Sequence, residues 1–213
     1  YCSRVTMLRG VLIAPPGSNL SGPLIAGMHE KGLSLDLVPF QGDTDTGQFD
    51  LIIVIIAADR GISATEIEAF NQLRERQIPA LLLVTSLLPH DGITLADDRW
   101  DFDDVTMLIS RTLEKPVTPF LVLHDDAGLP IALYDLKSER VLNYSTGTAV
   151  EEESDQELKE IVKEFKIEFD DEDFTEDDFT TGLRVVAIPF IPERGIGIDQ
   201  SVRLLTMLQR AHS

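Results

Sequence analysis

The sequence predicts an α/β protein built on a mainly parallel sheet that helices cover on both faces. Short runs rich in Val, Ile and Leu alternate with helical patterns along most of the 213 residues, which is the order that βαβ units produce. These runs are almost continuously apolar, as is typical of strands buried on both faces. Hydrophobic residues make up 43% of the chain, which is enough to bury a large core at this length.

Six segments are predicted to be strands because each is a short apolar run bounded by polar or turn-forming residues. In chain order they are Gly10–Ala14, Leu33–Val38, Leu51–Ile56, Ala80–Thr85, Thr118–Leu123 and Arg184–Pro189. The longest apolar run, Leu51 to Ala58, is far shorter than the ~20 residues that a membrane-spanning helix needs. We therefore expect a doubly wound sheet and no contact with a membrane.

Helices are predicted between these strands from capping signals and from apolar residues at helical spacing. The first runs from Ser21 to about Lys31, because Pro23 is acceptable in a first turn and Gly32 can end a helix. In the second, Ser63 and Glu66 have the spacing of a capping box. A third helix begins at Asp101 and carries the apolar residues Val105, Leu108, Ile109 and Leu113. A fourth begins at Asp199 and carries Val202, Leu205, Met207 and Leu208.

The alternation breaks between residues 116 and 182. Leu129–Leu136 and Val141–Tyr144 read as a hairpin, and Ser154–Lys166 as an exposed helix with Leu158, Ile161, Val162 and Phe165 turned inward. The sequence therefore predicts an α/β core formed by residues 1–115 and 183–213, with a small inserted α+β lobe at 116–182.

The charge of the chain is strongly negative and unevenly distributed. The formal net charge is −19, and Glu151 to Asp178 contain 15 Asp or Glu against three Lys. Such a field disfavours the backbone of a nucleic acid, whose phosphates need clustered Lys and Arg. The acidic segment is either a solvated surface or a docking patch for a basic protein.

Cysteine and histidine usage argues against disulfides and metal sites. Cys2 is the single cysteine, and the histidines have no zinc-ligand spacing. A calcium loop beginning at Asp170 would need Gly at its sixth position, where Thr175 stands. We expect no bound metal and, because the N-terminus lacks a signal-peptide pattern, a cytoplasmic protein. His90 is the histidine to test, because it lies at the expected ligand-bearing edge of the sheet.

The turn after the first strand has the length of a phosphate loop without its chemistry. The loop G-x-x-x-x-G-K-[ST] supplies amide donors, a Lys for phosphate and a hydroxyl for Mg²⁺. Here Asn19 replaces the second Gly, Leu20 replaces the Lys, and only Ser21 keeps the hydroxyl. Pro15 and Pro16 cannot donate an amide proton, because proline has no backbone N–H. The eight residues of the turn are Ala14, Pro15, Pro16, Gly17, Ser18, Asn19, Leu20 and Ser21.

Taken in order, these segments resemble the GTP-binding domain of elongation factor G and related translational GTPases. Ala14 to Ser21 lies where that family has A-H-x-D-A-G-K-T, and Asp59-Arg60-Gly61-Ile62 resembles its A-x-x-G-V turn. The hairpin at 129–144 resembles the segment G-V-V-D-L-x-x-x-x-A-x-x-W, which opens an insert in elongation factor G. The resemblance implies a fold of P-loop GTPase type.

Two further segments depart from the motifs that the family uses. Pro39 stands in place of the Asp of D-T-P-G, Gly42 keeps its Gly, and Asp43 replaces the catalytic His. Thr85, Ser86 and Leu88 occupy the N-K-x-D position, so the Asn and Asp that select guanine are absent.

The resemblance therefore implies a pseudo-GTPase, a protein-interaction or regulatory module with no expected cofactor and no catalytic residue. One alternative is a translation-related GTP hydrolase that binds GTP and Mg²⁺ through Ser18, Asn19, Ser21, Gly42 and Asp43. Another is a docking domain of a longer elongation-factor-like polypeptide, whose acidic lobe meets a basic partner; the resemblance makes the ribosome one such partner.

Overall fold

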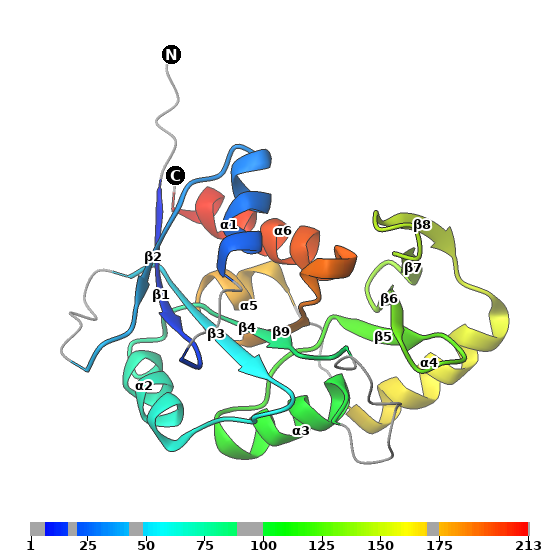
Figure 1. The fold of residues 1–213 in the computed structure, drawn as a ribbon, viewed down its shortest axis with the longest axis horizontal. Helices are drawn as coiled ribbons and strands as arrows, with labels where there is room; N and C mark the ends of the chain where they lie inside the picture. The colour runs from blue at the N-terminus through cyan, green and yellow to red at the C-terminus, as the bar shows by residue number, and fades with distance from the viewer. Residues whose placement is uncertain (1–6, 17–20, 43–48, 89–99, 170–174, 213) are drawn as a thin grey trace.

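The computed structural model describes residues 7–16, 21–42, 49–88, 100–169 and 175–212. Two sheets form in this part of the chain, a five-stranded parallel sheet and a four-stranded antiparallel sheet (Figure 1). The predicted α/β class is confirmed. No helix among the described residues combines the length and the apolar character that crossing a bilayer requires.

The parallel sheet has the strand order β2-β1-β3-β4-β9. Because the chain passes from β1 outward to β2 and then back across β1 to β3, the order reverses between β1 and β3, as in doubly wound sheets. Every residue of β3 and β4 is buried, which explains their uninterrupted apolar sequences. The bounds are Leu8–Ile13 for β1, Leu35–Pro39 for β2, Leu51–Ala57 for β3, Ala80–Thr85 for β4 and Val185–Pro189 for β9.

Helices pack on both faces of this sheet and divide the core into two clusters. The helices α2 (Ala64–Arg74) and α3 (Phe102–Thr112) contribute Phe70, Leu73, Phe102, Val105 and Ile109 to one cluster. The other face is covered by α1 (Ser21–Glu30), α5 (Glu176–Thr180) and α6 (Ile198–Ala211). The predicted helical positions thus face the sheet, with α2 and α3 on the opposite side from α1 and α6 (Figure 1).

Gly27 allows α1 to pack closely on α6. A Cβ atom placed at this position would lie 2.6 Å from Cγ2 of Ile198 and 3.7 Å from Cγ2 of Val202. Glycine in the middle of a helix costs about 1 kcal/mol relative to alanine, and here the cost is offset by the close approach of the two helices.

The helix starts predicted from capping signals are present. Ser63 and Glu66 form a complete capping box at α2, and Asp101 and Asp104 form another at α3. The last helix begins slightly earlier than predicted, because Gly197, with a φ of 88°, is its N-cap residue.

The prediction that Thr118–Leu123 belongs to the parallel sheet is wrong. This segment forms β5 (Phe120–His124), which pairs antiparallel with β6 (Pro130–Asp135) in the second sheet. Its last four residues are half-buried or exposed, so it lacks the two buried faces of a central parallel strand. The order of the second sheet is β5-β6-β7-β8, with β7 at Arg140–Asn143 and β8 at Val150–Glu153. The predicted hairpin is β6 and β7.

The helix predicted at Ser154–Lys166 is α4 (Gln156–Phe169). Val162 is buried and Leu158 is half-buried, but Ile161 is 52% exposed, so the prediction that Ile161 faces inward is wrong. Ile161 follows Glu160, and both residues lie on the exposed side of the helix. The side chain of Phe165 is not among those that the structure describes.

Helix α5 belongs to the packing of the parallel sheet although it lies within the segment predicted as a lobe. Phe179 is fully buried in the same cluster as Leu205 and Leu208 of α6. The boundary of the lobe at residue 182 stays a prediction.

Candidate functional site

The edge of the parallel sheet where its strands end is the candidate site. In doubly wound sheets, ligands bind beyond the carboxyl ends of the strands, next to the point where strand order reverses. Here that point lies between β1 and β3. The turns after β1, β2, β3, β4 and β9 therefore decide what this edge can bind.

The turn after β1 offers few donors in its described part. Ala14 is half-buried, Pro15 is buried and Pro16 is exposed, and neither proline has an amide proton. Ser21 is the first residue of α1, as predicted. The positions Gly17, Ser18, Asn19 and Leu20, which include the replacements for the second Gly and the Lys, lie outside the described residues.

In the turn after β2, packing does not require a glycine at position 42. Pro39 ends the strand and is exposed. Gly42 is exposed, and no atom of the described residues lies within 4 Å of a Cβ built on it. A side chain would therefore fit at Gly42, and packing does not account for the glycine. Asp43, the replacement for the catalytic His, lies outside the described residues.

The turn after β3 is tight and carries a cation. Gly61 adopts a φ of 70°, and its amide donates to the carbonyl of Ala57 at 2.9 Å. Arg60 is exposed in this turn. The sequence indicated this segment only as a structural match, so Arg60, which follows exposed Asp59, was missed as a charged residue of the edge. Its place between a buried strand and a capping box could have revealed it.

The turn after β4 is used for packing. The hydroxyl of Thr85 donates to the carbonyl of Ile56 at 3.3 Å, and Leu87 is only 6% exposed. Leu88 packs against the same core cluster. Ser86 adopts a φ of 59°, so the chain bends back there in a left-handed conformation. The positions that select guanine in the resembled family are thus occupied by side chains that hold the turn on the core. His90 lies outside the described residues.

The end of β9 is closed by apolar and polar contacts. Phe190 is 1% exposed, and its amide donates to the carbonyl of Val84 at 2.7 Å. Beyond it, the side-chain oxygen of Gln200 accepts from the amide of Gly197 at 3.2 Å, and its amide nitrogen donates to the hydroxyl of Tyr144 at 2.7 Å. Burial raises the pKa of Tyr144 to about 12, although the hydrogen bond with Gln200 acts in the opposite direction. Tyr144 is therefore neutral at physiological pH.

The acidic segment is spread over several elements of the lobe. Its first three glutamates form most of β8, where Arg140 pairs with Glu151 at 2.9 Å and with Glu153 at 3.4 Å. Among the described residues, no group of three or more His, Cys, Asp or Glu is arranged to hold a metal ion. Asp170 to Asp173, considered above for calcium, lie outside the described residues.

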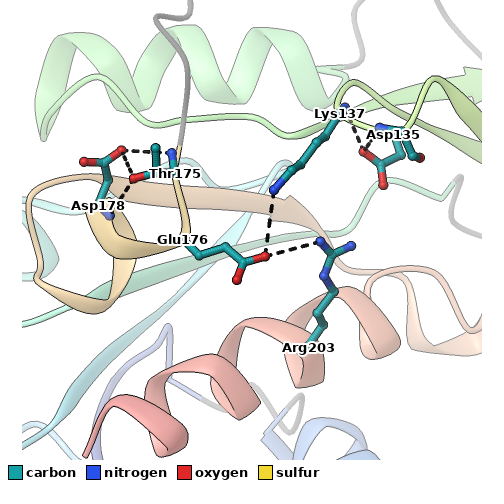
Figure 2. Close-up of polar contacts among 7 residues, drawn as sticks. Asp135, Lys137, Thr175, Glu176, Asp178 and Arg203 are labelled. Atoms are coloured by element: carbon teal, nitrogen blue, oxygen red, sulfur yellow. Dashed lines mark hydrogen bonds and ion pairs between the residues drawn. The ribbon is translucent and has the colours of Figure 1, made fainter.

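At its far end, the acidic segment joins the lobe to the core. Figure 2 shows Glu176 of α5 between Lys137, in the β6–β7 turn, and Arg203 of α6, at 3.8 Å from each cation. Beside it, Thr175 donates to the carboxylate of Asp178 through its hydroxyl and its amide. These bonds lower the pKa of Asp178. All three charged groups of the ion pairs are at least 49% exposed, so the pairs position the elements and stabilise them little.

No protein-family model and no curated protein matches this chain. Among solved structures, the chain is similar to a protein from Thermus thermophilus, with a TM-score of 0.71 and 16% sequence identity. The alignment covers 96% of this chain and 40% of the Thermus protein, so this chain spans less than half the length of that protein. A likeness at this identity shows a shared fold, here an α/β fold that includes nearly the whole of this chain.

Proposed function

We propose that this chain is a pseudo-GTPase, a degenerate guanine-nucleotide domain that acts as a protein-interaction or regulatory module. The order of elements supports the P-loop GTPase type of fold that the resemblance implies. The antiparallel sheet is inserted between α3 and β9, where the resemblance to elongation factor G places an insert. The strand order is shared with other doubly wound sheets, so the turns carry the argument about activity.

The observation that carries the proposal is that, in the described parts of the turns after β1 and β4, side chains without nucleotide chemistry pack on the core. Pro15 is buried after β1, and Leu87 and Leu88 pack on the core after β4. A guanine nucleotide needs a cluster of amide donors and a cation at the turn after β1. In the resembled family it also needs a carboxylate at the turn after β4. A charge-assisted contact contributes about 1.5–3 kcal/mol, and the net charge of −19 further disfavours an uncompensated triphosphate.

Calorimetric titration with GTP and GDP in the presence of Mg²⁺ tests the proposal. We expect no binding heat at nucleotide concentrations of tens of micromolar. A matched variant, Leu88→Asp, returns a carboxylate to the turn after β4. We expect it to unfold at a lower temperature, because Leu88 packs on the core, and to bind no nucleotide. Low-micromolar binding by the natural chain would overturn the proposal.

A GTP hydrolase with a non-standard site is the second candidate. Ser21 begins α1, and Gly42 lies exposed after β2, so both are placed at the same edge of the sheet. On this hypothesis, Ser21→Ala abolishes phosphate release from GTP, because the hydroxyl would be the ligand of Mg²⁺. An unchanged rate in that variant would dismiss the hypothesis.

A docking domain within a longer polypeptide is compatible with the main proposal, and the basic partner could be ribosomal. This chain aligns with 40% of the Thermus protein. Replacing acidic side chains of Glu151 to Asp178 by amides is a cleaner test than deletion, because deletion also removes buried Val162 and the first residues of α5. We expect the amide variant to lose capture by basic proteins. Capture that depends on neither salt nor these carboxylates would count against this role.

A further inference from the structure

The second sheet ends in an open, negatively charged strand. We propose that the outer edge of β8 (Val150–Glu153) binds an extended peptide segment rich in Lys or Arg, which adds to the sheet as a fifth strand. This inference gives the partner chemistry of the interaction module proposed above, and only its biological role rests on that proposal.

The backbone of β8 is available on one side. The strand is the last of the order β5-β6-β7-β8, and its inner side pairs with β7 in the register Arg140↔Glu153 to Asn143↔Val150. Within the described ranges, no strand pairs with its outer side, and Figure 1 shows β8 at the periphery of the lobe. In an antiparallel sheet, alternate residues direct their N–H and C=O groups to opposite sides. Those that point outward from β8 can pair with an added strand.

The strand is also held in place before any partner arrives. Arg140 of β7 binds Glu151 at 2.9 Å, and the amide of Asn143 donates to Glu152 at 3.1 Å. Immediately after the strand, the hydroxyl of Ser154 donates to the carbonyl of Glu139 at 2.8 Å. A preformed edge lowers the cost of ordering the protein on binding.

The side chains of β8 specify a basic occupant. Successive residues of a strand point to opposite faces, so Glu151 and Glu153 lie on one face and Glu152 on the other. Arg140 serves two carboxylates, of which Glu153 is 88% exposed, and Asn143 brings no charge to Glu152. Both faces of the edge thus carry excess negative charge. A strand with Lys or Arg at successive positions would place a cation beside each face.

A second copy of the chain is disfavoured as the occupant. Its own β8 would bring Glu against Glu, and like charges directly opposite each other destabilise a strand pair. Charged side chains on edge strands commonly prevent self-association for this reason. The same glutamates attract a positively charged peptide. They therefore both repel a second copy of the chain and favour a basic partner.

Two-dimensional NMR of the labelled protein tests the proposal with an octapeptide in which pairs of successive Lys residues alternate with pairs of Val, so that each face of the added strand carries Lys. We expect amide shifts and protection from hydrogen exchange confined to β8 and its neighbour β7, with affinity that falls as salt is added. The variant Glu152→Gln with Glu153→Gln should weaken binding at least fivefold. The matched control, Glu157→Gln with Glu160→Gln, removes two exposed charges from α4 and should change it less than twofold.

Two outcomes would overturn the proposal. If the same peptide with methylated alternate amides binds equally well, backbone pairing is absent and the contact is diffuse attraction. If both double variants weaken binding equally, β8 is not the site. Nucleotide titration reports separately on the sheet edge, so binding of GTP would overturn the pseudo-GTPase proposal and leave this one standing.

Discussion

The side chain of Arg74 shows how single polar residues fasten distant parts of this chain. Its guanidinium group forms two hydrogen bonds of 2.9 Å with the carboxylate of Glu114. It also donates to the carbonyls of Ile78 and Gly182, the latter 108 residues away in sequence. Lysine lacks the planar fork that makes four such bonds. Arg74 thus ties the loops before β4 and β9 to the end of α2.

Asp103 gives a pH-dependent prediction at the same scale. Loss of water around its carboxyl, together with repulsion from Asp101 and Asp104, raises the pKa of Asp103 to about 6. Its contribution to stability is therefore fully present below the ordinary pKa of 3.8 and is lost as the pH rises through about 6. We expect Asp103→Asn to stabilise the protein at pH 7.5, with a gain that shrinks towards pH 5. The residue is exposed overall, so the gain is small.

Urea unfolding between pH 5 and 8 measures this gain. Glu68→Gln removes an equal charge from the exposed side of α2 and serves as the control. A gain for Asp103→Asn that stays constant across the interval would contradict the assigned cause.

At the scale of elements, α5 is too short to be stable without its cap and its anchor. Thr175 and Asp178 form a complete capping box, and Phe179 is fully buried beneath it. We expect Thr175→Ala to lower the free energy of unfolding by about 1 kcal/mol, the usual cost of losing an N-cap side chain. Thr175→Ser keeps the hydroxyl and should cost much less. Equal losses in the two variants, measured by urea unfolding, would assign the effect to the methyl group instead.

The elements that the sequence predicted well carry local signals. The capping boxes at Ser63 and Asp101, and the wholly apolar strands β3 and β4, follow from neighbouring residues alone. The segment Val150–Glu153 gave no strand signal because three of its four residues are glutamates, and it pairs through β7 with residues far from it in sequence. The prediction that β5 belongs to the parallel sheet failed for a similar reason. Whether β5 pairs with β6 or with β9 depends on tertiary contacts, which its own residues do not report.

The site was predictable in its chemistry and not in its packing. The residue types at Pro15 and Pro16 showed that two backbone N–H donors are missing from the turn after β1. Leu88 showed that a carboxylate is missing from the turn after β4. That Leu87 is buried and that Thr85 bonds to Ile56 depends on the fit between β3 and β4, which no local pattern reports. Asn19, Leu20, Asp43 and His90 lie outside the described residues, so their roles stay predictions.

At the scale of the whole molecule, the second sheet is joined to the rest of the core by one buried and one half-buried polar contact. Tyr144, just after β7, accepts a hydrogen bond from Gln200 of α6, and Arg194 donates to the carbonyl of Pro130 at 3.0 Å. We expect Tyr144→Phe to destabilise the protein by about 1–3 kcal/mol, because the amide of Gln200 loses its acceptor in a buried place. The pair Tyr144→Phe with Gln200→Leu should recover part of that loss.

Hydrogen exchange of the second sheet distinguishes a local from a global effect. If the contact couples the sheets, amides of β6 and β7 exchange faster in Tyr144→Phe while those of β3 and β4 change only with overall stability. Faster exchange restricted to α6 would instead show that the hydroxyl serves the helix alone.

The route by which the chain leaves the parallel sheet and returns to it has an evolutionary consequence. The amide of Val117 donates to the carbonyl of Val185 at 2.7 Å, and the amide of Ala187 donates back to the carbonyl of Val117 at 2.9 Å. Departure and return are thus neighbours, so the part of this segment outside α5 can change in length without moving a strand of the parallel sheet, whereas Phe179 of α5 belongs to the core of that sheet. We therefore expect insertions and deletions in related chains to fall in the antiparallel sheet and α4 more often than in the parallel sheet.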